Sequence, residues 1–379
     1  MKNERFEDPA ACPSARRRFR LPEEAGFHAL LAVAATCYAA LRFTFNPPFD
    51  ATFFQKIYDF IAPVPFGKRV LIAWLARPLV AGGLSISGAY QFWEACSAFA
   101  LLLGLYRLFG QMVEKPWARL LSVGFVFVLP PIFLLRTPFP YLFPWDTPAM
   151  AFIAWALHFL LQGAWGRALV LTLFAAANRE SALLIPLLFG ALYVDRLPLP
   201  KLVGIGLGLA AAYLAVAGLV SLTLANNLPY YSASPFASFH KHGQWRIFIN
   251  LDWLTANWRN GWVLLASMGG LPLAFLALVR QIPPPLRRFA LIAFFYFAQL
   301  VFIGNLDEAR IYGEIAVILY VPVALGCRRH VGGGGDRFRL PGADNFLHPF
   351  MPILEAAAAA AIAAFLVFGY CVLKAKPLV

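Results

Sequence analysis

The stretch Phe45–Arg69, with the sequence FNPPFDATFFQKIYDFIAPVPFGKR, lies between the first hydrophobic run of the chain and all the later ones. Its middle part, Ala51–Ala62, has apolar residues at the spacing of a helix with one apolar face, which is typical of a helix lying along a membrane surface. Those apolar residues are Phe53, Phe54, Ile57, Tyr58 and Ile61. Pro63 and Pro65 should end the helix, because proline lacks the N–H that a helix needs. We therefore predict that this stretch, which contains Asp50, forms one wall of a site at the boundary between water and lipid.

The composition indicates the class of protein. Of its residues, 60% are hydrophobic and only 13% are charged, and the mean hydropathy is +0.67. A soluble domain usually has about 25% charged residues, so the chain is predicted to be an integral membrane protein. The formal net charge of +13 would also suit a nucleic-acid partner, but the basic residues occur in short clusters between apolar runs. The excess of positive charge in cytoplasmic loops explains these clusters better, and we expect no nucleic acid.

The hydrophobic runs predict an all-α polytopic bundle of about ten or eleven transmembrane spans, since about 20 apolar residues cross a bilayer as a helix. The segment 70–83 contains Arg77 and Pro78, and is predicted to be a half-helix that does not cross. The other predicted spans are 26–42, 87–110, 118–135, 147–163, 166–178, 181–195, 202–226, 262–280, 288–304, 311–326 and 351–373.

Positive charge sets the predicted orientation. The tail 1–25 is basic directly before the first span, which places the N-terminus in the cytoplasm, and most Lys and Arg of the connections then share that side. We expect a multi-pass protein of the bacterial inner membrane, in the cell envelope. The predicted parts are the cytoplasmic tail 1–25, the bundle 26–326 with outer loops 43–69 and 227–261, a cytoplasmic Gly/Arg linker 327–350, and a last transmembrane helix within 351–379.

Five connections on the predicted outer face carry polar residues that are costly near a membrane and therefore indicate a site or ion pairs. They contain Asp50 and Arg69; Asp146; Arg179 and Glu180; the loop Asn226–Gly261; and Asp307, Glu308 and Arg310. A purely structural explanation exists for several. Asp146 and Glu180 each begin a predicted helix and could cap it, and Arg310 could pair with Glu314 four residues later.

The long outer loop is rich in aromatic residues. It includes Tyr230, Tyr231, His240 and Trp245 among other aromatic and amide side chains. An aromatic belt at the membrane interface is the commoner explanation, whereas aromatic rings mixed with amides also stack on and hydrogen-bond to sugars. The composition leaves both explanations open.

Metal chemistry has a weak signal. The five cysteines are dispersed and form no zinc-ligand pattern, so neither a disulfide nor a structural metal is predicted. His240 and His242 would share one face of a strand, but an isolated pair of this kind in a loop is more often simply polar.

The order and sidedness of these residues resemble the polytopic membrane glycosyltransferases of the GT-C fold, which use sugars carried on polyprenyl phosphate. The similar features are the Asp of the first outer loop (Asp50), the surface helix after it, the Pro-x-x-x-Arg re-entry (Pro65 to Arg69), the Asp that opens a later span (Asp146), the Arg-Glu pair of NRES (Arg179, Glu180), and the late acidic-basic pair of DEARIY (Glu308, Arg310). They cover most of Phe45–Tyr312.

The resemblance implies a glycosyltransferase that moves a sugar from a polyprenyl-phosphate carrier to a glycan, lipid or protein acceptor on the non-cytoplasmic face. It implies catalytic roles for Asp50, Asp146 and Glu308, and substrate contacts through Arg69, Arg179, Glu180, Arg310, Tyr230, Tyr231, His240 and Trp245. The first loop has a single Asp where several such families have an acidic pair, so no metal ligand is predicted and a divalent cation is left open.

The same chemistry follows from the residue types. Glycosyl transfer needs a carboxylate to accept the acceptor's proton, for which we choose Asp50, and cations to stabilise the departing phosphate, for which Arg69, Arg179 and Arg310 are candidates. The alternative function is a transporter or flippase of lipid-linked saccharides. A transporter usually has broken helices near mid-membrane and an internal repeat, whereas here the charges gather at one face and no repeat is visible.

Overall fold

The computed structural model of the chain describes residues 20–50, 52–63, 66–133, 141–224, 240–241, 244–332, 340 and 350–375. These residues form an all-α bundle, in which the only described strands are a two-residue antiparallel pair, β1 (His240–Lys241) and β2 (Gln244–Trp245), with His240 opposite Trp245. The predicted fold class is confirmed at the level of an all-α polytopic bundle.

The helices of the first half are α1 (Arg20–Phe45), α2 (Phe53–Tyr58), η1 (Phe66–Lys68), α3 (Leu71–Ala81), α4 (Ile86–Phe109), α5 (Lys115–Gly124), η2 (Phe125–Phe127), α6 (Leu129–Phe133), α7 (Asp146–Leu161), α8 (Trp165–Asn178), η3 (Glu180–Leu183) and α9 (Leu184–Tyr193). Those of the second half are α10 (Leu199–Thr223), α11 (Arg246–Ala256), α12 (Trp258–Ser267), α13 (Leu271–Leu278), α14 (Pro284–Arg287), α15 (Phe289–Ile303), η5 (Ala309–Tyr312), α16 (Gly313–Gly332) and α17 (Met351–Ala375).

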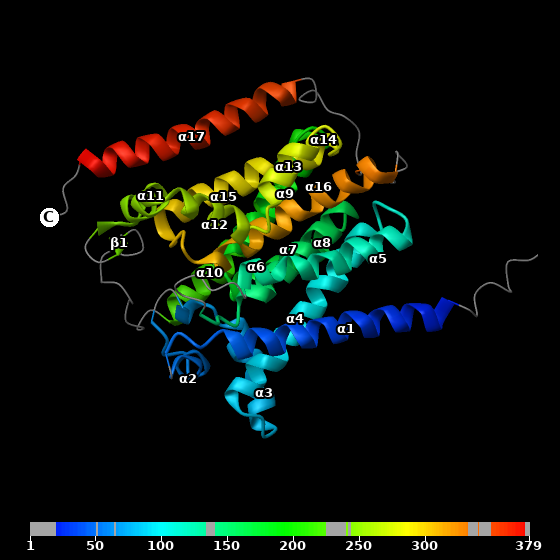
Figure 1. The fold of residues 1–379 in the computed structure, drawn as a ribbon, viewed down its shortest axis with the longest axis vertical. Coiled ribbons are helices and arrows are strands. Elements are labelled where there is room, and N and C mark those ends of the chain that lie inside the picture. Colours follow the sequence, from blue (N-terminus) through cyan, green and yellow to red (C-terminus); the bar gives the residue numbers. More distant parts are fainter. Residues whose placement is uncertain are drawn as a thin grey trace, which may run out of the picture.

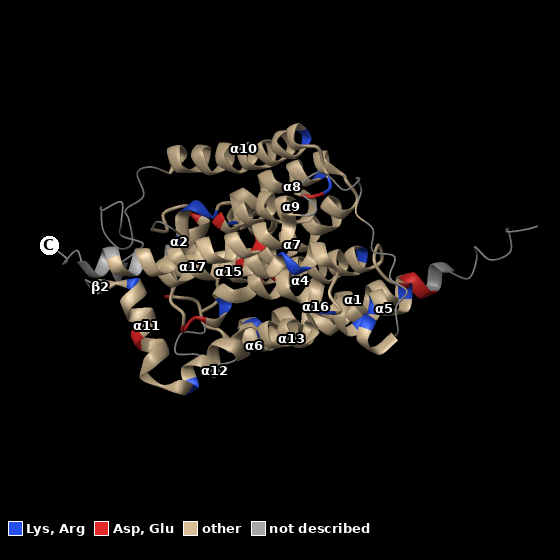
Figure 2. Ribbon diagram, turned by 90° about the horizontal axis from the view of Figure 1, so that it is seen from above, with Lys and Arg blue, Asp and Glu red and all other residues tan. Residues whose placement is uncertain are grey.

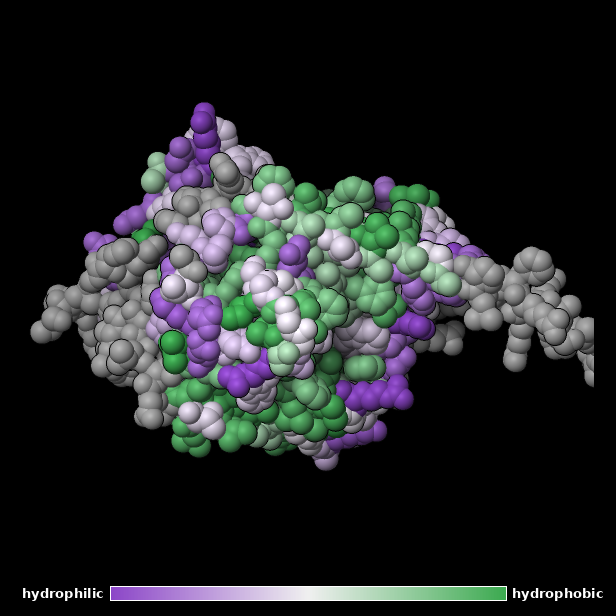
Figure 3. All heavy atoms as spheres, turned by 90° about the horizontal axis from the view of Figure 1, so that it is seen from below, coloured by the Kyte–Doolittle hydropathy of each residue, from purple (hydrophilic) through white to green (hydrophobic). Residues whose placement is uncertain are grey.

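Seven of the described helical segments are long and apolar enough to cross a membrane, so this is a multi-pass membrane protein. They are Glu23–Phe45, Ile86–Phe109, Lys115–Phe133, Leu199–Thr223, Pro284–Ile303, Ala309–Gly332 and Met351–Phe368; the bent pair α12–α13 would add an eighth. Figure 2 shows few charged residues along the long helices and more toward their ends, and Figure 3 shows apolar side chains over much of one face, with polar groups between them.

The sequence predicted ten or eleven spans, whereas seven or eight described segments are long enough to cross a membrane. The difference arises because the prediction counted α7, α8 and α9 as spans. These helices have 16, 14 and 10 residues, which is short for a bilayer. The helix α7 is buried on nearly all sides, as expected of a helix enclosed by its neighbours rather than by lipid. Whether the three short helices cross the membrane stays a prediction.

The bundle has two distinct ends (Figure 1). The helices α2 and α11 and the strand β1 lie toward the left of the view, whereas α5 and α14 lie toward the right. Ion pairs hold the right end together, such as Arg119 with Glu23 at the start of α1, and Arg328 of α16 with Glu114 before α5. The connections predicted to be outer therefore gather at one end and those predicted to be cytoplasmic at the other, although the direction across the membrane stays a prediction.

The predicted surface helix is shorter and more enclosed than expected. It covers six residues, and its apolar residues Phe53 and Ile57 are buried against the protein rather than turned toward lipid. The ring of Phe53, for example, contacts the rings of Phe66 and Phe143. It ends before Pro63, because Phe60 adopts a left-handed φ of 57° that a helix cannot continue. Of the apolar residues in this stretch, Ile61 is exposed.

Candidate functional site

The first outer loop lies beside the chain that leads into α7. Pro48 and Leu142 form a parallel bridge, and the N–H of Leu142 donates to the carbonyl of Pro47 at 2.9 Å. The ring of Phe49 contacts Tyr141 and Phe143, with centroids 5.1 and 6.2 Å apart. Asp50 and Asp146 are thus carried by two strips of chain that pack side by side.

Asp146, the first residue of α7, is at the centre of a group of charged side chains. It is only 1% exposed, and its carboxylate receives three arginines from three different segments. Arg42 of α1 lies 3.2 Å from Oδ2, while Arg179, which ends α8, and Arg310 of η5 lie 3.0 and 3.7 Å from Oδ1. Four helices therefore meet at one carboxylate.

Two further carboxylates complete the inner part of this group. Glu94 of α4 lies 2.5 Å from Arg42 and Glu314 of α16 lies 3.0 Å from Arg179, and both carboxylates are buried. Thr147 bridges Arg42 and Glu94, since its hydroxyl accepts from the guanidinium at 2.8 Å and donates to the carboxylate at 2.5 Å. Burying a charge is tolerated only with such partners, so the inner part acts as one unit.

Two ion pairs form the outer part, where the group meets its surroundings. Arg69 pairs with Glu180 at 3.1 Å, and Arg310 pairs with Glu308 at 2.5 Å. The Glu180 side chain is 49% exposed, against 12% for Glu308. We name the nine residues that share these contacts the charged cluster: Arg42, Arg69, Glu94, Asp146, Arg179, Glu180, Glu308, Arg310 and Glu314.

Aromatic rings line the outer part of the charged cluster. The ring of Phe66 stacks on those of Phe143 and Trp145, which are tilted to each other, and the centroids of the three rings are 5.4 to 6.1 Å apart. The guanidinium of Arg310 lies 3.7 Å from the centre of the Phe143 ring, and that of Arg69 lies 4.7 Å from the Trp145 ring. Such contacts hold a guanidinium plane in place while leaving its N–H groups for other partners.

Asp50 stands apart from the charged cluster among the contacts that the structure describes. Its carboxylate accepts hydrogen bonds from the N–H and hydroxyl of Thr52, both at 2.8 Å, and from Lys56 at 3.2 Å, and its side chain is 40% exposed. Partial burial alone would raise the pKa of Asp50, but these hydrogen bonds outweigh it and lower the pKa below its usual value. The carboxylate is therefore ionised at neutral pH and reachable from water.

The second half of the long outer loop is anchored beside the cluster. Arg246 donates to Asn305, and Asn305 donates to Glu308 of the cluster. The amide of Asn250 donates to the carbonyls of Val301 and Gly304 and accepts from the N–H of Leu306. Trp245 precedes α11, but Tyr230 and Tyr231 lie outside the described residues, as does the side chain of His240.

Metal ligands do not gather in the described part of the chain, where no group of three or more His, Cys, Asp or Glu side chains could hold an ion. Carboxylates of the cluster face guanidinium groups, which repel a cation. Sequence reasoning named six members of the cluster as site residues and missed the inner partners Arg42, Glu94 and Glu314 in that role. The available signal was that Arg42 and Glu94 are opposite charges within two predicted spans, where charges must pair.

The comparisons with known proteins add no relative. The chain matches no protein-family model, and no curated protein or solved structure is significantly similar to it. Its function is therefore inferred from the chemistry of these residues.

Proposed function

We propose that the charged cluster binds the phosphate of a polyprenyl-phosphate sugar and that the protein is a membrane glycosyltransferase of GT-C type. The observation that supports this is the crowding of Arg69, Arg179 and Arg310 at one end of an apolar bundle. Burial lowers the pKa of Arg69; the negative charges of Glu180 and Asp146 oppose this shift, and the positive charges of Arg179 and Arg310 add to it. Because the charged cluster has four arginines and five carboxylates, a phosphate would bind these guanidinium groups by taking the place of a carboxylate.

The four arginines would have different roles. Arg42 and Arg179 are held by buried carboxylates, so we assign them to positioning the cluster together with Asp146, whose oxygens are enclosed. Arg69 and Arg310 belong to the outer part, where Glu180 and Glu308 would give up one pairing when the phosphate arrives. Bidentate guanidinium contacts would then stabilise the negative charge that grows on the phosphate as its bond to the sugar breaks.

Asp50 is the base that we propose for the acceptor. Its neighbour Phe49 contacts Phe143, the ring over which Arg310 lies, so Asp50 flanks the proposed phosphate site. The hydroxyl of the acceptor would transfer its proton to the Asp50 carboxylate, its oxygen would bond to the sugar, and the polyprenyl phosphate would leave. We place the reaction at the non-cytoplasmic face of a bacterial inner membrane, because the charge pattern of the loops favours a cytoplasmic N-terminus.

The test is sugar transfer by the purified protein from a panel of polyprenyl-phosphate sugars to a mixture of acceptors. Arg69→Lys and Arg310→Lys should each lower donor use by about ten- to a hundredfold, because lysine loses the bidentate contact, worth roughly 1.5–3 kcal/mol. Arg259→Lys on α12, exposed and outside the cluster, is the matched control.

Two results would contradict the proposal. One is a wild-type rate that both lysine substitutions leave unchanged, which would mean that the arginines serve only as ion-pair partners. The other is passage of the intact sugar lipid across vesicles without release of sugar, which would identify a flippase instead.

A further inference from the structure

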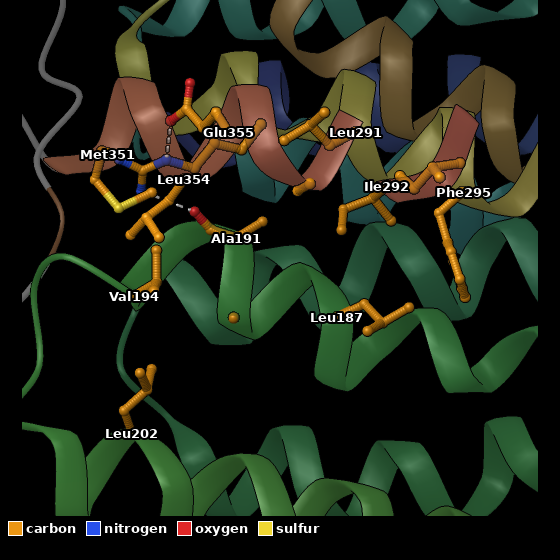
Figure 4. A pocket seen from close by; sticks show the side chains of 14 residues that line it. Leu187, Ala191, Val194, Leu202, Leu291, Ile292, Phe295, Met351, Leu354 and Glu355 are labelled. Atoms are coloured by element: carbon orange, nitrogen blue, oxygen red, sulfur yellow. Dashed lines mark hydrogen bonds and ion pairs between the residues drawn. The ribbon is translucent and has the colours of Figure 1, made fainter. Parts of the chain in front are cut away.

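A second feature lies at the end of the bundle opposite to the charged cluster. A cleft of about 430 Å³ separates α17 from α9, α10 and α15 (Figure 4). Its walls are apolar, with Leu187 from α9, Leu202 from α10, Leu291 and Phe295 from α15, and Leu354 from α17. The volume falls in the range of about 300–1,000 Å³ that is usual for sites of small ligands.

The cleft is open toward the hydrocarbon of the membrane. Figure 1 shows α17 lying along one side of the bundle, and the structure buries only 6% of its apolar span, mostly against α15. The cleft lies between α17 and the rest of the bundle, so its apolar part opens at the side of the bundle that would face lipid. A ligand that enters there must therefore be largely hydrocarbon.

The polar end of the cleft has a defined charge pattern. Arg288 donates to Asp195 through two bonds of 2.7 and 2.8 Å, to Glu355 of α17 at 2.7 Å and to the carbonyl of Ala191 at 3.1 Å. The cationic group is thus shared by two carboxylates, and the Glu355 side chain is still 32% exposed. Arg196 also acts on Asp195 electrostatically, but it does not line the cleft.

We propose that this cleft holds an acyl chain of a membrane phospholipid with a zwitterionic head group that carries a primary amine, such as phosphatidylethanolamine. The apolar walls take the chain, and the exposed carboxylate of Glu355 accepts a hydrogen bond from the amine. A lipid with net negative charge fits less well, because Arg288, the cation that lines the cleft, is already paired with two carboxylates, Asp195 and Glu355.

Gly190 provides a direct test, because it lines the cleft and a Cβ built on it would have no atom within 4 Å. Gly190→Leu should therefore place an apolar side chain in the cleft from an open Cβ position, and leucine favours a helix over glycine. Gly218→Leu makes the same change at an exposed position of α10, where a Cβ also has open space, but outside the cleft. Ala358→Phe fills the cleft from the other wall, on α17.

The measurement is native mass spectrometry of delipidated protein titrated with dioleoyl phosphatidylethanolamine, phosphatidylcholine and phosphatidylglycerol. We expect phosphatidylethanolamine to bind at least tenfold more tightly than the other two, and Gly190→Leu and Ala358→Phe to weaken it at least tenfold while Gly218→Leu leaves it unchanged. Glu355→Gln should remove the advantage over phosphatidylcholine and leave phosphatidylcholine binding as it is.

Three outcomes would overturn the inference. They are tighter binding of phosphatidylglycerol, equal binding of all three lipids by the wild type, and equal loss in Gly190→Leu and Gly218→Leu. None of these measurements depends on sugar transfer, so the lipid site is tested independently of the proposed function.

Discussion

At the scale of single residues, two aspartates that look alike in the sequence have opposite surroundings. Asp146 is enclosed by three arginines, whereas Asp50 is held by a local turn and remains open to water. A carboxylate that accepts a proton from an acceptor must be within hydrogen-bond reach of it. The structure therefore favours Asp50 over Asp146 for this role.

Asp50→Asn keeps the size of the side chain and the oxygen that accepts both bonds from Thr52, but it removes the acceptor for Lys56 and the basicity. If Asp50 is the base, sugar transfer should fall by about 10²–10⁴-fold while the protein still inserts and unfolds as the wild type does. Asp59→Asn is the control, because Asp59 is exposed at the end of α2 and accepts only a local bond from Gln55 among its described contacts. Equal losses in the two variants, measured as initial rates, would exclude the assignment.

The ion-pair partners were harder to predict than the residues themselves. The four-residue spacing suggested that Arg310 pairs with Glu314, but Arg310 pairs with Glu308 and reaches Asp146, while Glu314 pairs with Arg179. The reason is that Arg310 belongs to η5, and the α-helix with its four-residue ladder begins only at Gly313. Ion pairs between residues that are distant in the chain depend on how the helices pack, and the periodicity of the sequence does not predict that packing.

At the scale of helices, the inner part of the charged cluster fixes how neighbouring helices pack. Hydrophobic packing alone would allow these helices to shift relative to one another. Arg42 connects α1 to α4 through Glu94 and to α7 through Asp146. Lipid and helix surfaces are about equally apolar, so polar contacts specify which helix faces meet.

Arg42→Met should destabilise the protein by about 3–5 kcal/mol, because it leaves Glu94 buried without its cation. Adding Glu94→Gln should recover part of that loss by removing the unpaired charge. Lys56→Met, which breaks an ion pair with Asp50 that is about 40% exposed on both sides, should cost only about 0–1 kcal/mol. The free energy of unfolding in detergent micelles would be measured for Arg42→Met, for Arg42→Met with Glu94→Gln, and for Lys56→Met. A similar loss of stability in Arg42→Met and Lys56→Met would mean that the buried ion pairs add no stability.

Hydropathy located the helices well and their breaks poorly. The predicted span 262–280 is two helices that meet at 79°, because Gly269 and Gly270 both adopt left-handed φ values, of 64° and 68°. Glycine takes such values without strain, but a Gly-Gly pair in an apolar run does not by itself indicate a break. The short helices α7 to α9 were predicted to be spans from their apolar content, which does not report helix length, and whether they cross the membrane stays a prediction.

At the scale of the whole molecule, the chain places the charged cluster at one end and the Arg288 cleft at the other. The two ends should face different compartments if the loops follow the charge rule.

Single cysteines introduced into a background without the five native ones would test this arrangement. Gln55→Cys, exposed on α2, should react with an impermeant thiol reagent in intact cells, whereas Gln162→Cys, exposed at the far end of α7, should react only after lysis. The reverse pattern would invert the orientation, and labelling of both in intact cells would break the predicted topology.

The pairing of Arg42 also constrains how the protein is made. Glu94 follows Arg42 by 52 residues and Asp146 follows it by 104. At a synthesis rate of about 5–20 residues per second, the ribosome delivers these partners roughly 3–10 s and 5–20 s later. An arginine costs about 2.5–3.5 kcal/mol at the centre of a membrane helix and less near its ends, and Arg42 is in the last turn of α1. We therefore expect this turn to stay at the membrane interface until α4 and α7 supply the partners of Arg42, which would make the first helix of the chain one of the last to settle.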